Sequence, residues 1–387
     1  MEASAHHLCT LLRSELEGVC VSCEFSDDEA RRLYALAKRH DLAHLVTAAL
    51  ERCGRMPEGE LGELFARERL LAVYRCGRQT HGATLAMDAL AAAGIAYVPL
   101  KGAVIRPLYP EPWMRTCCDV DILVREEDLD RAVAAIGAAC GLVERPHRKF
   151  HDVLLCLDPE THVELHFSLR EGYEAMDAVL ARAWEYAVPE EGYRYRLLPE
   201  FLIFYHIAHM AHHFLHGGCG LRPFLDLYLL ERSLAYDASS LDALLSKARL
   251  LTFAAAAREA VATWLGGVAP TERVRQMGDY LFPAGAYGLL DNRVAIGAAG
   301  KSRFRYILGR IFLPYAVLSE YYPTLRGRRL LTPWYQVRRW CAILKKRARR
   351  RGAFAELRRS AALSDGQAAR MSALLAAVGL DKEKTFS

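Results

Sequence analysis

Strand signals are confined to one segment in the middle of the chain, and this limits the folds that the chain can adopt. Apolar residues recur at helical spacing through most of the first 94 residues, and the same spacing returns from Pro199 onward. Between these regions, short runs rich in β-branched residues are bounded by turn signals. The pattern predicts a helical region over 1–94, an α/β core over 95–198 and a helical region over 199–387.

Within the core, four runs read as strands, and the last two are joined by a turn at Asp158-Pro159. The predicted strands are 95–100, 119–124, 151–157 and 162–167. Outside the core, Ser26 followed by three acids is a typical helix start. A long helix is predicted over 60–93, with a break near Gly77 or Gly82, and 280–299 is predicted to be rich in loops.

The composition is that of a globular protein and argues against several other classes of protein. The 387 residues are 52% hydrophobic and 25% charged, which predicts two or three domains with a true core. The net charge of +5 does not by itself argue for nucleic acid. Eleven cysteines without paired spacing fit a reducing compartment. Without a signal peptide or an apolar stretch long enough to cross a bilayer, the prediction is a cytoplasmic protein with no transmembrane segment.

Asp119 and Asp121 stand one residue apart at the start of a predicted strand. Because side chains alternate along a strand, both carboxylates face the same side, with Cα atoms about 6.5–7 Å apart. The residues that follow, Ile122 to Val124, continue into the core. Two carboxylates at the end of a buried strand are costly unless a cation neutralises them, and a hard ion such as Mg²⁺ (or Mn²⁺) suits oxygen ligands. A solvated strand end is the alternative.

A later strand supplies a third acid. The same alternation places His162, Glu164 and His166 on one face and apolar residues on the other. Three carboxylates from two strands are what a two-metal site needs. The alternatives are that Glu164 pairs with a lysine or arginine, and that His166 makes a structural hydrogen bond to a neighbouring carboxylate.

Lys101 and Gly102 lie at a predicted strand-to-helix turn. Glycine lets backbone amides approach a phosphate closely, and a helix N-terminus favours anions. Lys101 would add a point charge, and Arg115 could clamp a phosphate. Structural ion pairs are the alternative for both side chains. Each motif is weak when taken alone, and the specific signal is their order along the chain.

Several motifs resemble those of a known family. They are Val98-Pro99-Leu100-Lys101-Gly102-Ala103, Tyr109-Pro110, Arg115, Asp119 to Val124 and Val163 to Phe167, then His206 to His209 and Leu221 to Leu227, with weaker matches at Phe312-Leu313-Pro314, Tyr322-Pro323 and Arg338. Over roughly 30–340, and most densely over 97–167, the chain resembles the uncharacterised nucleotidyltransferase family of the DNA polymerase beta-like superfamily. The broader superfamily usually has Gly-Ser or Gly-Gly at the phosphate turn, where this chain has Lys101-Gly102.

The resemblance implies an α+β (α/β) fold with a polymerase beta-like core, a mixed sheet, flanking helices and a cleft for nucleotide and magnesium. The predicted function is metal-dependent transfer of a nucleoside monophosphate from a nucleoside triphosphate (NTP), such as ATP, to an unknown acceptor, with release of pyrophosphate. The catalytic and metal-binding residues would be Asp119, Asp121 and Glu164. The nucleotide- or phosphate-binding residues would be Lys101, Gly102, Arg115 and His166.

Two other function classes remain open on sequence grounds. One is a catalytically inactive nucleotide-binding or interaction module. The other is an RNA-directed transferase or toxin-like factor that uses the basic tail over 338–359, which would bind an acidic partner such as RNA or an acidic membrane surface. The acceptor would be a small molecule, a protein or RNA.

The C-terminal helical region contains two further features. Four histidines between 209 and 216 share one helical face, and we interpret this helix as lining the nucleotide cleft rather than binding zinc, since no His-Glu-x-x-His motif is present. Arg222 and Asp226, four residues apart, are predicted to form an ion pair within one helix or to line the cleft.

Overall fold

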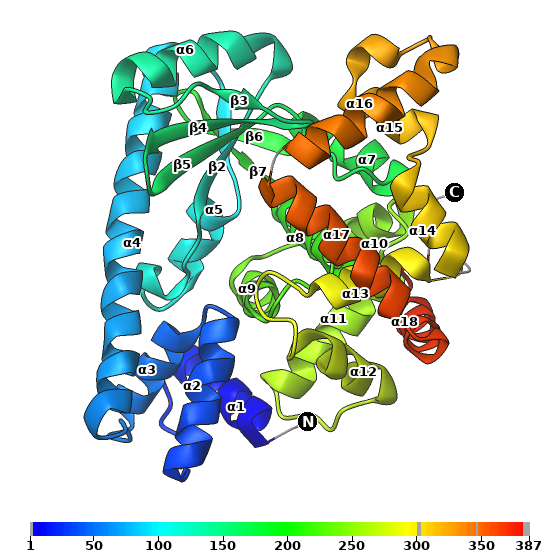
Figure 1. Cartoon of the computed structure of the whole chain (residues 1–387). Helices are drawn as coiled ribbons and strands as arrows, with labels where there is room; N and C mark the ends of the chain where they lie inside the picture. Colours follow the sequence, from blue (N-terminus) through cyan, green and yellow to red (C-terminus); the bar gives the residue numbers. More distant parts are fainter. Residues whose placement is uncertain (1–2, 300–302, 346, 382–387) are drawn as a thin grey trace.

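A computed structural model describes residues 3–299, 303–345 and 347–381 (Figure 1). Lys346 of the predicted basic tail lies outside the described residues. The N-terminal region is helical, as predicted, and Ser26 and Glu29 form a reciprocal capping box at the start of its second helix. Its helices are α1 (Ala3–Glu17), α2 (Asp27–Arg39), α3 (Ala43–Arg52) and α4 (Gly59–Ala92).

The middle of the chain forms one seven-stranded mixed sheet in the order β3-β4-β5-β2-β1-β7-β6. Its strands are β1 (Tyr97–Pro99), β2 (Asp119–Val124), β3 (His147–Arg148), β4 (Asp152–Asp158), β5 (Thr161–His166), β6 (Ala187–Glu191) and β7 (Arg194–Leu197). The pairs β2–β5 and β1–β7 are parallel and the other pairs are antiparallel. The connecting helices are α5 (Gly102–Ile105), α6 (Leu129–Cys140) and α7 (Glu174–Leu180). The α+β architecture with a mixed sheet and helical flanks is confirmed.

After the sheet the described chain is helical. The remaining helices are α8 (Pro199–Leu215), α9 (Arg222–Ser233), α10 (Ala238–Lys247), α11 (Leu251–Trp264), α12 (Glu272–Leu281), α13 (Leu290–Ala298), α14 (Arg303–Ile311), α15 (Tyr315–Tyr321), α16 (Thr332–Lys345), α17 (Arg347–Ala362) and α18 (Asp365–Ala377). The segment 280–299 was predicted to be rich in loops, but only the residues between α12 and α13 form a loop. The rest is helical, and Val294 and Ala298 are buried on one side of α13.

The two faces of the sheet pack against different helices. Val120, Ile122 and Val163 join a hydrophobic cluster with residues of α4 and α6. Leu123, on the opposite face, belongs to a larger cluster that includes Phe201 of α8. This follows from the alternation of side chains along β2, and it leaves the acids of β2 on the side of α8.

Helix α4 is continuous over 34 residues, so the predicted break at Gly77 or Gly82 is wrong. Its first turns contribute Leu61 and Phe65 to the larger cluster, and its last turns contribute Ala86 and Leu90 to the smaller one. Figure 1 shows α4 running along one whole side of the molecule. Gly82 is retained inside the helix because a Cβ there would lie 2.5 Å from Cγ2 of Thr161 on β5.

The two glycines of α4 provide a matched test of this packing. At Gly77 a Cβ would meet nothing within 4 Å, so Gly77→Ala should stabilise the protein by up to about 1 kcal/mol through helix propensity. Gly82→Ala has the same propensity gain but forces Thr161 and the sheet to move, which costs about 1–3 kcal/mol. We expect urea denaturation to place Gly82→Ala below Gly77→Ala in free energy of unfolding. Equal stability of the two variants would contradict the close helix–strand contact.

Candidate active site

The acids predicted from the sequence lie on two neighbouring parallel strands. In the register of β2 and β5, Asp119 is opposite His162 and Asp121 is opposite Glu164. His166 follows Glu164 by two residues and therefore shares its face. The structure thus brings the Asp-x-Asp pair and the third acid onto one face of the sheet.

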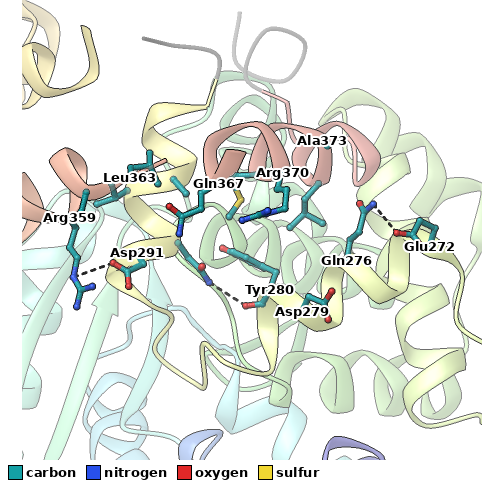
Figure 2. Close-up of a pocket in the computed structure, with 16 residues that line it drawn as sticks. Glu272, Gln276, Asp279, Tyr280, Asp291, Arg359, Leu363, Gln367, Arg370 and Ala373 are labelled. Carbon is teal, nitrogen blue, oxygen red and sulfur yellow. Dashed lines mark hydrogen bonds and ion pairs between the residues drawn. The ribbon is translucent and has the colours of Figure 1, made fainter. Parts of the chain in front are cut away.

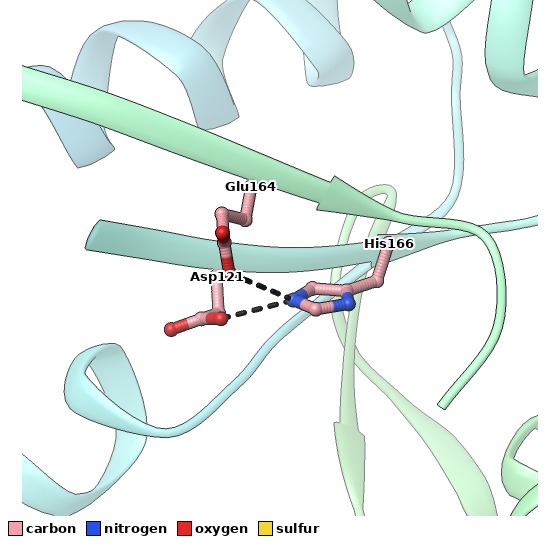
Figure 3. Close-up of side chains that lie close together, drawn as sticks. All are labelled: Asp121, Glu164 and His166. Atoms are coloured by element: carbon pink, nitrogen blue, oxygen red, sulfur yellow. Dashed lines mark hydrogen bonds and ion pairs between the residues drawn. The ribbon is translucent and has the colours of Figure 1, made fainter. Parts of the chain in front are cut away.

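Asp121 is the centre of this group. Its Oδ1 accepts a hydrogen bond from Nζ of Lys101 at 2.7 Å and lies 2.9 Å from Nε2 of His166. Ligand atoms from Asp121, Glu164 and His166 all lie within 4.8 Å of one another (Figure 3), and among the described residues this is the one group of three that could hold a metal ion. Asp119 lies outside that group, at 3.8 Å from Nδ1 of His162.

Glu164 is held by a lysine that the sequence analysis did not single out. Nζ of Lys149 lies 2.6 Å from Oε1 of Glu164 and 3.1 Å from Oδ2 of the buried Asp152. Glu164 therefore has a lysine partner, as the alternative interpretation held. Its other oxygen, Oε2, lies 3.9 Å from Nε2 of His166, so one oxygen still points toward the group.

The pKa values of the two aspartates on β2 are shifted in opposite directions. Burial would raise the pKa of Asp121, but the Lys101 ammonium and His166 outweigh it and hold this pKa well below its usual value. Burial would likewise lower the pKa of Lys101, and the charge of Asp121 raises it instead. The pKa of Asp119 is raised by burial and by the negative charges of Glu164 and Asp121. Both causes disfavour the charged form of Asp119, and a nearby cation would favour it.

Lys101 reaches the acids because of an uncommon backbone conformation. It precedes α5 with φ 43° and ψ −111°, a positive φ that few residues other than glycine adopt. Gly102 follows, and a Cβ at this position would lie 3.0 Å from both Nη1 of Arg115 and Sγ of Cys117. The strand-to-helix turn therefore directs the lysine at Asp121 and needs a glycine beside it.

Arg115 is committed to a buried ion pair. Its Nε and Nη2 each lie 2.9 Å from an oxygen of Asp226, and the hydroxyl of Tyr109 donates to the same carboxylate at 2.8 Å. The side chains of Arg115 and Asp226 are 8% and 2% exposed. Of the two alternatives for Arg115, the structure has the structural ion pair. The predicted pair of Arg222 with Asp226 is not formed, because Asp226 points to Arg115 while Arg222 donates to the carbonyl of Thr116 at 2.8 Å.

Histidines of α8 line the other side of the site. Nδ1 of His209 and Nδ1 of His212 lie 2.7 Å and 3.1 Å from the two oxygens of Glu171, and Nε2 of His213 lies 3.0 Å from Nε2 of His209. Burial lowers the pKa of His212 to about 4 and of His213 to about 3, so both are neutral near pH 7. Among the described residues these histidines form no three-ligand metal group.

A cleft of about 400 Å³ separates the acids from the histidines. Asp119, Asp121 and Glu164 line it on the side of the sheet, and His209 and His213 line it on the side of α8. Lys101, Gly102, Arg115 and His166 also border this cleft, so all the predicted site residues meet at one place.

A second hollow, of about 540 Å³, lies far along the helical region between α12, α13, α17 and α18 (Figure 2). Its wall includes Asp279, Arg370 and the ion pair of Asp291 with Arg359 at 3.2 Å. None of the predicted site residues borders it. The two hollows are therefore separate features of the molecule.

The sequence analysis missed Lys149 and Glu171, which hold Glu164 and two cleft histidines. Both lie in connecting segments outside the regular elements, where spacing carries no information about contacts. The one available signal was charge: a sheet face that carries three acids on two neighbouring strands requires nearby cations.

A mixed sheet with acids on two paired parallel strands, facing helices across a cleft, is the arrangement of a nucleotidyltransferase-like α+β fold. The comparison with protein families agrees with this class. The chain belongs to the family described as uncharacterised nucleotidyltransferase, whose model matches residues 26–266. This membership indicates a transferase that uses a nucleoside triphosphate.

The match extends from the cap of α2 to the end of α11. It contains the whole sheet and the cleft helices α8 and α9, whereas the weaker motifs near 312–314, 322–323 and 338 lie beyond it. No curated protein and no solved structure matched the chain. Within the described part of the chain, no helix is both long enough and apolar enough to span a bilayer.

Proposed function

We propose that this protein is a metal-dependent nucleotidyltransferase in which an acceptor oxygen attacks the α-phosphorus of an NTP. The new bond joins that oxygen to phosphorus, the bond from the α-phosphorus to the bridging oxygen of the β-phosphate breaks, and pyrophosphate leaves. The observation that carries the proposal is the convergence of Asp121, Glu164 and His166 at the edge of a cleft, with Asp119 on the same strand face. We further propose 95–198 as the catalytic core, with 1–94 and 199–387 as helical flanks.

The donor set fits Mg²⁺ or Mn²⁺. In the structure Oδ1 of Asp121 and Oε1 of Glu164 have lysine partners, and no hydrogen bond from a described residue is found to Oδ2 of Asp121. One oxygen of each carboxylate is thus available, and Asp119 adds further negative charge. Carboxylate oxygens are the preferred ligands of these ions. When bound, such ions neutralise charge on the triphosphate and activate the attacking oxygen.

The protein's own groups have separate roles in this proposal. Asp119, Asp121 and Glu164 hold the ions, and Glu164 also receives the acceptor's proton. Lys101 and His166 orient Asp121. They also border the cleft beside the acids, as the Gly102 backbone does, and there they would contact the phosphates of the NTP. Arg115 acts through Asp226, which positions α9 against the turn that bears Gly102. Catalysis then rests on positioning and charge compensation.

The experiment that tests the proposal is calorimetric titration of ATP, GTP, CTP and UTP with magnesium. The wild-type chain should bind one or more of them only when the metal is present. The Asp119→Ala/Asp121→Ala variant should lose that binding, because the ligands of the ions are gone. Folded wild-type protein that binds none of the four nucleotides would overturn the assignment.

A further inference from the structure

Exposed apolar side chains are concentrated in the segment 303–345, which we call the basic lobe. Nine of the 23 exposed large hydrophobic residues among the described residues lie there, although the lobe has only 43 of the 387 residues. Leu330 is 96% exposed, Trp334 65% and Val337 58%. The family match ends at residue 266, so the lobe is not part of the matched catalytic region.

Helix α16 turns an apolar stripe toward solvent. Trp334, Val337, Cys341 and Leu344 are all exposed, and their spacing of three and four residues places them on one helical face. The opposite face is held to the lobe: Tyr335 and Gln336 are buried, and Nε2 of Gln336 donates to the carbonyl of Leu313 at 2.6 Å. A surface helix normally turns its apolar stripe to the core, so this orientation leaves the stripe uncovered by the part of the chain that the structure describes.

Cationic residues lie along one edge of the stripe and just before it in the chain. The lobe carries nine arginines and lysines and one acid, a net formal charge of +8, whereas the whole chain carries +5. Arg326, Arg328 and Arg329 are exposed at and just before the short 3-10 helix Arg329–Leu331, which presents Leu330. Arg338 and Lys345 are exposed along one edge of the stripe. An open groove of about 650 Å³ beside the stripe is walled by Phe312, Val337 and Leu344 among others.

We propose that the basic lobe docks on an anionic lipid surface, with the apolar stripe of α16 and Leu330 inserted at headgroup depth. An amphipathic helix with tryptophan and leucine on one face and arginine or lysine at its edges is the type of element that lies in such an interface. The arginines around Leu330 would lie against lipid phosphates, where each basic residue is attracted by the surface charge.

Two other binding partners, a nucleic acid and a second copy of the chain, fit the basic lobe less well than a lipid surface does. A single-stranded nucleic acid would use the charges and the exposed aromatic residues Phe312, Tyr321 and Trp334. The aliphatic side chains that make up most of the stripe and its surroundings, such as Leu330, Val337 and Leu344, give bases no stacking surface. A second copy of the chain would bring two lobes of net charge +8 together, and like charges oppose such a contact.

Co-sedimentation with vesicles tests the proposal on the full chain. Vesicles of phosphatidylglycerol and phosphatidylcholine should bind the protein, and vesicles of phosphatidylcholine alone should not. The tryptophan emission should shift to the blue on binding, since Trp334 leaves water. Equal binding to both vesicle types, or binding to neither, would overturn the proposal.

Two pairs of variants separate the apolar and the charge contributions. Trp334→Glu/Val337→Glu should weaken vesicle binding at least about tenfold, whereas Leu70→Glu/Val73→Glu, which changes exposed apolar residues of α4, should not. Arg328→Ala/Arg329→Ala should weaken it by about 30-fold, from about 1 kcal/mol per residue, while Arg31→Ala/Arg32→Ala on α2 should have little effect.

All replaced side chains are exposed, so the variants should keep the circular dichroism spectrum of the wild type. If the lobe variants and their controls weakened binding equally, the lobe would not be the docking surface. If light scattering showed a concentration-dependent dimer that only Trp334→Glu/Val337→Glu dissociates, the stripe would be an interface between copies and the proposal would be wrong.

Discussion

Replacing Asp121 by asparagine should reduce nucleotidyl transfer by at least about a thousandfold. Asparagine keeps the size of the side chain but removes the negative charge that Lys101 and His166 enclose. The loss should fall on the rate of transfer, because a metal ligand is absent, and the circular dichroism spectrum should show that the variant stays folded. It can be measured as transfer of label from an α-labelled NTP to the small-molecule or macromolecular fraction of a cell lysate.

Asp130→Asn is the matched control for this substitution, since Asp130 is an exposed acid on α6, away from the cleft. It should leave the rate unchanged. Retention of full transfer by Asp121→Asn would remove Asp121 from the catalytic group. Loss of transfer in both variants would point to a general effect of charge rather than to the site.

Arg115→Ala should cost about 3–5 kcal/mol in free energy of unfolding. The substitution leaves the buried carboxylate of Asp226 with the Tyr109 hydroxyl but without its ion-pair partner. The pKa of Asp226 is low although burial would raise it, because the Arg115 charge outweighs burial, and that stabilisation would be lost. Urea denaturation followed by circular dichroism would measure the change.

A double variant distinguishes a broken pair from a lost contact with substrate. Arg115→Met/Asp226→Leu removes both charges and should recover much of the stability that Arg115→Ala loses, because no uncompensated charge stays buried. A variant Arg115→Ala with wild-type stability and weakened NTP binding would instead support the phosphate-binding alternative for this arginine.

The sequence predicted the strands β2 and β5 well because their signals are local. Alternation along a strand needs only the positions of neighbouring residues, and β2 was placed at 119–124 without error. The shared face of Asp119, Asp121 and Glu164 follows from that alternation together with the parallel register of β2 and β5. The expectation that the two strands lie together came from the three carboxylates that a two-metal site needs.

The contacts that complete the site could not be read from local patterns. Arg115 and Asp226 are 111 positions apart, and His209 and Glu171 are 38 apart, so only the tertiary fold brings them together. The hairpin of β6 and β7 was missed because its strands are short and largely polar, and the turn at Gly192, with φ 54°, is the main sign of it. Lys101 was identified, but its positive φ depends on the surrounding packing.

The continuity of helix α4 limits where residues can be inserted into this protein or deleted from it. At 1.5 Å per residue its 34 residues extend about 50 Å, and opposite ends of the same rod contribute to two different hydrophobic clusters. Inserting or deleting one residue between Phe65 and Ala86 would rotate one end relative to the other by about 100° and turn its apolar side out of the cluster. Substitutions at exposed positions leave this relation between the two ends unchanged, whereas the number of residues between them is fixed by it.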